Sequence, residues 1–413
     1  MTSRSWLQLP LLALAMAVAG YVRTAVSPLQ EAMRLAWSLG DNQMALLQGP
    51  AIGIPVALAA IPLGLLIDRT CRVRLLRWLV GLSMVGSLLT AIANGFAVLL
   101  IARSLAGVTA LAIVPVAFSL IADLYPPQSR GRATTVIFIG QVAGNSAAFA
   151  LGGALLAAAP EIDGWRWAML WLVAPLVPVA LMLFALREPP RMGVSIENPS
   201  LRQVWRELRR YRATITPLAL GIVLVETALG ATLIWSAPML SRRFPLAPDA
   251  VGMIMAAGMM ISGIAGPVLG GVLADMCQRS GGPRRTLQVL AILAMFGVPA
   301  GLFASMPGVT SASILLTVVM TLIIAVATMG MALFTIVIPN ELRGLCMAML
   351  SAAILLFALA VAPMAVSVVS GLMGGLAAIG DALSIVCVAA GMMATAAFMV
   401  AGRFLPQAVV QSK

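Results

Sequence analysis

The chain has 413 residues, of which 61% are hydrophobic and only 10% are charged. These fractions exclude an ordinary water-soluble domain, whose surface needs far more charge, and they equally exclude a disordered chain. The formal net charge of +12 is the only feature that would suggest a nucleic-acid partner in a soluble protein. The remaining class is an integral membrane protein.

Apolar runs that are long enough to cross a bilayer recur along the whole chain. A spanning helix requires roughly 20 mainly apolar residues. This criterion predicts twelve spans, at residues 6–27, 43–67, 75–95, 98–122, 133–158, 166–186, 214–240, 249–276, 285–305, 311–336, 343–371 and 378–404. The first run lacks a following small-residue cleavage pattern, so we expect a retained span and not a cleaved signal.

Only one connection between the predicted spans is long and polar, and it carries seven arginines. It divides the spans six and six. We therefore predict an N-terminal six-helix bundle over 1–186, a cytoplasmic linker over 187–212 and a C-terminal six-helix bundle over 213–413. The expected fold class is an all-α integral membrane protein with two pseudo-symmetric bundles.

The two halves also carry matching sequence motifs. Gly64–Asp68 closes the second span, and Gly271–Asp275 closes the eighth. Pro126–Gly131 follows the fourth span, and Pro339–Gly344 follows the tenth. Both pairs are separated by about half the chain. This spacing indicates a duplicated six-helix unit, which is the usual construction of secondary transporters.

The basic residues predict the orientation of the spans. If the N-terminus is inside, only four of the 26 basic residues lie in outer loops, namely Arg34, Arg166, Arg242 and Arg243. An excess of arginine and lysine marks the cytoplasmic side. We therefore expect both termini in the cytoplasm and the chain in the inner (plasma) membrane. The positive charge then indicates topology, and no nucleic-acid partner is expected.

Three charged side chains lie inside the predicted spans and away from their ends: Arg23, Arg103 and Glu226. A charge at bilayer depth costs at least roughly 2.5 to 3.5 kcal/mol, so each needs a compensating environment. Arg23 and Arg103 share a depth in the outer half, and no acid lies within the spans of the first bundle. Together they favour bidentate binding of an anion. The alternative for Arg103 is a purely structural bond to an exposed backbone carbonyl.

Glu226 lies in the seventh span, which corresponds to the first span in the duplicated unit. It is a counter-ion of Arg23, a substrate ligand or a proton carrier, and the sequence leaves these alternatives open. Histidine is absent, and Asp68, Asp123 and Asp275 lie at inner boundaries that water reaches. We therefore expect Glu226 to be the only buried acid available to carry a coupling proton. Gln141 and Asn145 are weaker candidates for substrate hydrogen bonds, although bonding between helices is the commoner role of such side chains. Tyr21 and Trp235 are candidates for an apolar cavity wall, although aromatic residues in membrane helices more often face lipid or core.

A second group of charges lies at the inner ends of spans. Asp68, Arg69 and Arg72 surround the end of the second span, Asp123 ends the fourth and Asp275 ends the eighth. We expect these residues to form a cytoplasmic gate of ion pairs. The alternative, that they only set topology, is weaker because acids contribute little to orientation.

Three segments resemble the major facilitator superfamily. They are Gly64–Arg74, Arg103–Gly107 and Ile121–Tyr125. The resemblance implies two six-helix bundles around a central cavity that work by alternating access, and it supports the same gate. Arg23 and Arg103 are similar in placement to those of the spinster-like group. That group's acids, its usual proton carriers, are replaced by Val22 and Ala110, so the resemblance does not extend proton coupling to this chain. The arginine-rich first span is also similar to carriers of the cyanate-transporter type.

These observations together predict a secondary active transporter for an organic anion or an anionic amphiphile, such as a lysolipid-like molecule or a small carboxylate or phosphate. A drug or metabolite exporter that recognises apolar or cationic compounds through Glu226 is the first alternative, and a non-transporting sensor or scaffold is the second. No phosphate-binding loop, metal cluster or nucleophile with histidine is present, so we expect no enzyme, cofactor or metal. We expect a monomer whose partners are its substrate and membrane lipids.

Overall fold

The computed structural model describes residues 8–160, 163–190, 201–338 and 340–404. These residues are almost entirely helical, and none of them is in a strand, which confirms the predicted all-α fold class. Within these described ranges, eleven segments are long and apolar enough to cross a membrane. One of them, Pro248–Ser305, is 58 residues long and covers the predicted eighth and ninth spans.

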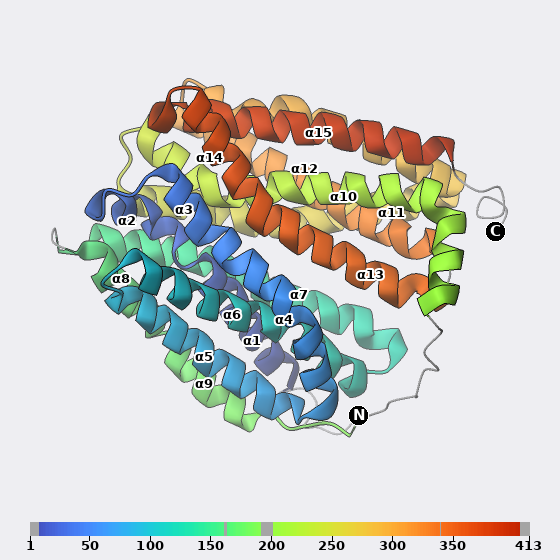
Figure 1. Ribbon diagram of the computed structural model, residues 1–413, viewed down its shortest axis with the longest axis horizontal. Coiled ribbons are helices and arrows are strands. Elements are labelled where there is room, and N and C mark those ends of the chain that lie inside the picture. Colours follow the sequence, from blue (N-terminus) through green and yellow to red (C-terminus); the bar gives the residue numbers. More distant parts are fainter. Residues whose placement is uncertain (1–7, 161–162, 191–200, 339, 405–413) are drawn as a thin grey trace. The chain divides into compact units, whose positions relative to one another are not determined.

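Contacts group the chain into two compact units: unit 1 is Met1–Gly193 with Ser236–Met260, and unit 2 is Val194–Trp235 with Ile261–Lys413. Unit 1 holds the helices that run from blue to green in Figure 1. They are α1 (Gln8–Thr24), η1 (Ser27–Leu29), α2 (Gln30–Ala36), α3 (Asp41–Gln48), α4 (Pro50–Arg69), α5 (Arg72–Ile92), α6 (Phe96–Leu124), α7 (Pro127–Ala157), α8 (Gly164–Val173), α9 (Leu176–Met182) and η2 (Leu183–Ala185).

The first two spans differ from the predicted boundaries at their outer ends. The first span was expected to end near residue 27, but η1 and α2 continue the helical path to Ala36. Gly49 interrupts the second span between α3 and α4, where its φ of −108° and ψ of −94° are not helical. These short helices bring polar side chains of the first loop close to the bundle.

Two close helix contacts give unit 1 its shape. α1 packs along α7, and α5 packs along α6. The α1 contact depends on glycine, because a Cβ atom on Gly140 or Gly144 would overlap the backbone of α1 at Ala13 or Ala17. Small residues of this kind let membrane helices approach to backbone contact. α1, which carries Arg23, is thereby held against a neighbouring helix of its own unit.

Unit 2 holds most of the remaining helices, with the C-terminal end of α10 and the start of α11 assigned to unit 1. The elements are α10 (Leu201–Arg243), α11 (Pro248–Ala300), η3 (Gly301–Ser305), α12 (Val309–Val337), α13 (Asn340–Ile354), the π-helical turn η4 (Leu355–Val361), α14 (Ala362–Leu372), η5 (Gly375–Ala378) and α15 (Ile379–Arg403). Gly282 breaks α11 with a φ of +64°, which glycine adopts without strain. The break separates two predicted spans.

Candidate functional site

Arg103 lies two turns into α6 and is fully buried. Its Nη2 atom donates to the backbone carbonyl of Arg23 on α1 at 3.3 Å, and the neighbouring Ser104 donates to the carbonyl of Ala51 on α4 at 2.5 Å. Within the part of the chain that the structure describes, Nε and Nη1 of Arg103 have no hydrogen-bond partner. The guanidinium therefore has one structural bond and two buried donors left for another acceptor.

Other predicted contact residues of unit 1 gather around α1. Tyr21 is buried, and its hydroxyl has no partner among the described residues. Asn145 on α7 accepts a 2.9 Å hydrogen bond from Thr24, while Gln141 is half-buried with its backbone carbonyl against Gly20. Arg23 is half-buried and follows Tyr21 by two residues on α1. α1, α6 and α7 thus bring five of the predicted substrate-contact residues into one unit.

The other two predicted contact residues lie on α10 in unit 2. Glu226 is half-buried in the membrane-spanning part of the helix. Trp235 is fully buried, and its Nε1 atom donates to the carbonyl of Pro363 on α14 at 3.1 Å. The polar atom of Trp235 is therefore occupied by a bond within unit 2, which suits a packing role for this side chain.

Arg72 forms the centre of a buried ion-pair cluster at the start of α5. It bonds to Asp123 at the end of α6, and its Nε atom lies 2.8 Å from a carboxylate oxygen of Glu188, just after η2. The Arg72 side chain is only 4% exposed. All three residues belong to unit 1, so the cluster ties three segments of that unit together.

Glu188 is the member of this cluster that the sequence analysis missed. Partial burial favours its neutral form, but hydrogen bonds from the backbone N–H of Val73 and from the side chains of Arg72 and Cys71 outweigh burial and lower its pKa. The signal was available, because Glu188 is a lone acid among arginines directly after the sixth span. Its ionised form is therefore the one that completes the cluster.

The remaining predicted gate residues occupy more open positions. Asp68 and Arg69 are exposed at the end of α4, and Asp275 is exposed on α11 in unit 2. Of the five predicted gate residues, Arg72 and Asp123 form an ion pair with each other. The gating role of the group stays a prediction.

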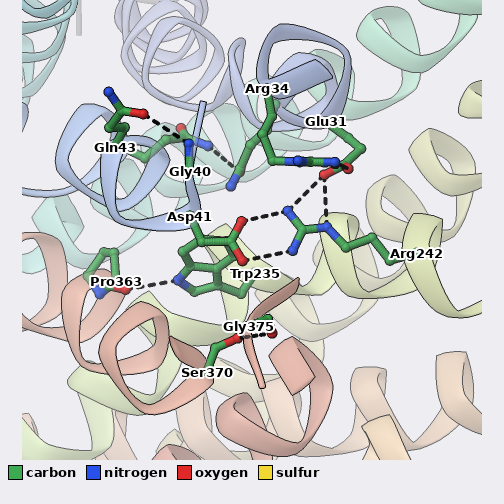
Figure 2. A network of polar contacts seen from close by, with 12 residues as sticks. Glu31, Arg34, Gly40, Asp41, Gln43, Trp235, Arg242, Pro363, Ser370 and Gly375 are labelled. Atoms are coloured by element: carbon green, nitrogen blue, oxygen red, sulfur yellow. Dashed lines mark hydrogen bonds and ion pairs between the residues drawn. The ribbon is translucent and has the colours of Figure 1, made fainter. Parts of the chain in front are cut away.

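A second ion-pair cluster in unit 1 is centred on Arg242 (Figure 2). Arg242 at the end of α10 contacts Glu31 of α2 at 2.9 Å and Asp41 of α3 at 2.7 Å. Glu31 also pairs with Arg34 at 2.6 Å. Both guanidinium edges of Arg242 are used, since Nη1 and Nη2 donate to Asp41 and Nε donates to Glu31. The sequence analysis treated Arg34 and Arg242 only as outer-loop charges.

Replacing Arg242 by glutamine is expected to destabilise the protein by about 2 kcal/mol, because two carboxylates that are mostly buried lose charge-assisted hydrogen bonds. The matched control is Arg243→Gln, since Arg243 is exposed and stacks on the neighbouring Phe244, and it should change stability by less than about 0.5 kcal/mol. Thermal unfolding of both variants in detergent measures the difference. Equal unfolding temperatures for Arg242→Gln and Arg243→Gln would contradict a stabilising role for the Arg242 ion pairs.

Comparison with known proteins gives a match to the family model described as Major Facilitator Superfamily over residues 12–356. The curated relatives include the 3-(3-hydroxy-phenyl)propionate transporter of Escherichia coli K12, which is 31% identical over 164 residues, or 39% of this chain and 36% of the relative. They also include the human protein spinster homolog 1, which is 27% identical over 217 residues, or 50% of this chain and 40% of the relative. The chain thus spans well under half the length of these two relatives.

Among solved structures, the chain is similar to a bacterial homologue of the human lysosomal transporter Spinster, crystallised in an inward-facing and unoccupied conformation. The TM-score is 0.83 at 21% identity, and the match covers 100% of this chain and 99% of that one. At this identity the likeness establishes the fold. The matched family and relatives are transporters and not enzymes.

Proposed function

We propose that this chain, which belongs to the Major Facilitator Superfamily and is a multi-pass membrane transporter of small molecules, carries an organic anion or an anionic amphiphile by alternating access. The candidate anion site lies in unit 1 and is formed by Arg23 and Arg103, with Tyr21, Gln141 and Asn145 nearby. Glu226 of unit 2 is the third charged side chain inside the spans, and it too needs a compensating partner during the transport cycle. We place the protein in the inner membrane as a monomer with cytoplasmic termini.

The observation that carries this proposal is the environment of Arg103. Its side chain is fully buried, and two of its nitrogen atoms have no partner in the residues that the structure describes. A cation at this depth costs free energy unless an opposite charge or acceptor satisfies it. Nε and Nη1 lie on different edges of the guanidinium, so each can donate to an oxygen of an anion, and a bidentate contact on either edge would also use the second N–H of Nη2.

The curated relatives support an organic anion as the cargo. One of them is named for 3-(3-hydroxy-phenyl)propionate, and a propionate is a carboxylate joined to an apolar group. This chemistry combines the charge that Arg103 favours with the apolar surface of a membrane cavity. The relative matches only part of this chain, so its substrate indicates the class and not the compound.

Ligand-induced thermal stabilisation tests the proposal, because a ligand stabilises the folded form that it binds. We expect carboxylates or organophosphates, but not lipophilic cations, to raise the unfolding temperature of the wild type. Arg23→Gln and Arg103→Met should lose that shift. Without ligand, Arg103→Met should be at least as stable as the wild type, because it replaces a buried charge by an apolar side chain of similar volume.

The matched control is Arg132→Gln on α7, an exposed arginine that should keep the full ligand shift. If both site variants retain anion stabilisation and liposome flux, the anion site is wrong. A protein that binds anions but gives no flux in liposomes would instead be a sensor or scaffold.

A cation exporter is the second candidate function, and the half-buried Glu226 in a membrane-spanning helix favours it. In this case Glu226→Gln abolishes stabilisation by lipophilic cations, whereas Arg23→Gln leaves it intact. The same variant tests proton coupling, because Glu226 is the acid that we propose as a carrier. A flux that no longer depends on a pH gradient in Glu226→Gln would assign the coupling proton to this residue.

A further inference from the structure

The last part of the predicted cytoplasmic linker is helical. Residues 201–211 form about the first three turns of α10, and the helix continues from there into the membrane-spanning part, Arg212–Arg243. In Figure 1 these first turns run across the direction of the rest of α10. They belong to unit 2, as does the span up to Trp235, so the bend lies within one unit.

Pro217 explains where α10 bends. A proline inside a helix removes the hydrogen bond to the carbonyl four residues earlier, and its ring collides with that carbonyl. For Pro217 this carbonyl belongs to Ala213, which directly follows the first three turns. Thr214 then fixes the start of the span, because its Oγ1 atom donates to the carbonyl of Phe404 at 2.5 Å. Phe404 ends α15, the last predicted span, so residues 201–211 lie at the membrane boundary where α15 leaves the bilayer.

The sequence of these turns divides into two faces by helical register. Positions that are three or four residues apart share one face of a helix. One face is entirely apolar or aromatic, and it consists of Leu201, Val204, Trp205, Leu208 and Tyr211. All remaining positions are polar, and they are Arg202, Gln203, Arg206, Glu207, Arg209 and Arg210. Four arginines against one glutamate give this short segment a net positive charge.

This pattern is typical of a helix that lies in the plane of a membrane surface. Such helices have an arginine-rich polar face and an apolar face that contains tryptophan and leucine. Tryptophan and tyrosine, here Trp205 and Tyr211, favour the boundary between hydrocarbon and head groups. Each arginine near an anionic leaflet contributes a factor of about five to binding, whereas a zwitterionic leaflet offers the same apolar layer without that gain. Charge complementarity therefore selects anionic lipid.

We propose that residues 201–211 form an in-plane helix that docks on a leaflet of anionic phospholipids, with its apolar face in the acyl-chain boundary and its arginines among the phosphates. The helix is continuous with the span that carries Glu226, so docking fixes the start of that span. The arginines of the linker then bind lipid in addition to setting topology. The inference concerns the lipid surface and does not depend on the cargo proposed above.

Nitroxide labels on the full chain in nanodiscs test this docking. Cys71 is replaced by serine and the three buried cysteines by alanine, and Leu208→Cys or Gln203→Cys adds a single label site. In discs that contain phosphatidylglycerol, we expect the label at 208 to be accessible to oxygen and the label at 203 to a water-soluble nickel chelate. Access of the nickel chelate to both labels would indicate a solvated tether. Exclusion of both reagents from the label at 208 would indicate packing on protein, and either result overturns the inference.

Arginine substitutions measure the contribution of charge in the chain that carries Leu208→Cys. Arg206→Gln together with Arg209→Gln should lower the ratio of membrane-immersed to solvated label about 25-fold, because two factors of about five are lost. The control pair is Arg284→Gln with Arg285→Gln, since these arginines are exposed on α11 in the same unit and should leave the ratio unchanged. An unchanged ratio in the first pair, or equal ratios in phosphatidylglycerol and phosphatidylcholine discs, would refute the preference for anionic lipid.

Thermal unfolding of the chain with its native cysteines provides a second measurement. Phosphatidylglycerol added to detergent micelles should stabilise the wild type more than phosphatidylcholine does, because a bound lipid stabilises the folded form. The double variant Arg206→Gln with Arg209→Gln should lose most of this difference, whereas Arg23→Gln should keep it. Loss of the difference in Arg23→Gln alone would assign the lipid effect to the proposed cargo site and overturn this inference.

Discussion

Arg72→Met is expected to reduce the free energy of unfolding by about 3 kcal/mol, the lower end of the range for breaking a buried ion pair. Arg72 is almost completely buried, and it is the shared partner of Asp123 and Glu188. Its removal leaves two carboxylates facing one another without the charge between them. The lower end of this free-energy range applies because Glu188 is 29% exposed and water partly solvates it.

Denaturant or thermal unfolding in detergent measures this loss, and Arg74→Met is the matched control. Arg74 is exposed on the same helix, so its replacement should change stability by no more than about 0.5 kcal/mol. Arg72→Lys keeps the charge but loses the planar fork, and it should recover only part of the stability. A double-mutant cycle of Arg72→Met with Asp123→Asn decides the mechanism, because purely additive losses would mean that the two side chains do not interact.

The sequence was sufficient to predict the spans, because a bilayer imposes its thickness on the apolar runs. It also predicted that Arg72 and Asp123 lie at one end of the first bundle, because the position of each residue follows directly from the order of the spans. Glu188 was missed because the loop after η2 was treated as part of a linker. Its partnership with Arg72 depends on the path of the chain after the sixth span, which apolar periodicity does not encode.

The Arg242 cluster was missed for a related reason. Glu31 and Asp41 lie beyond the predicted end of the first span, where α2 and α3 continue the helical path. Without those short helices, the first outer loop has no defined position. The environment of Arg103 was likewise left open, because its bond to the Arg23 carbonyl depends on how α6 is rotated toward α1. Rotation about a helix axis is weakly specified when almost every side chain is apolar.

Gly144→Ala is expected to destabilise unit 1 by about 3 kcal/mol, which is the upper end for overpacking. The added Cβ atom would overlap the backbone carbonyl of Ala17 on α1, and backbone cannot rotate away as a flexible side chain does. α1 would have to move off α7. Gly131→Ala is the control on the same helix, because nothing lies within 4 Å of its added Cβ atom. That variant should be unchanged or more stable by up to about 1 kcal/mol, from helix propensity alone.

The Gly144 result also bears on how Arg23 moves during transport. If α1 and α7 stay in backbone contact throughout the cycle, α1 moves as part of a rigid unit and carries Arg23 and Arg103 together. Gly144→Ala should then lower stability and transport in proportion. A variant that folds at nearly wild-type stability but no longer transports would show that α1 must slide against α7. In that case the anion site is assembled and dismantled within unit 1, since the bond from Arg103 to the Arg23 carbonyl crosses from α6 to α1.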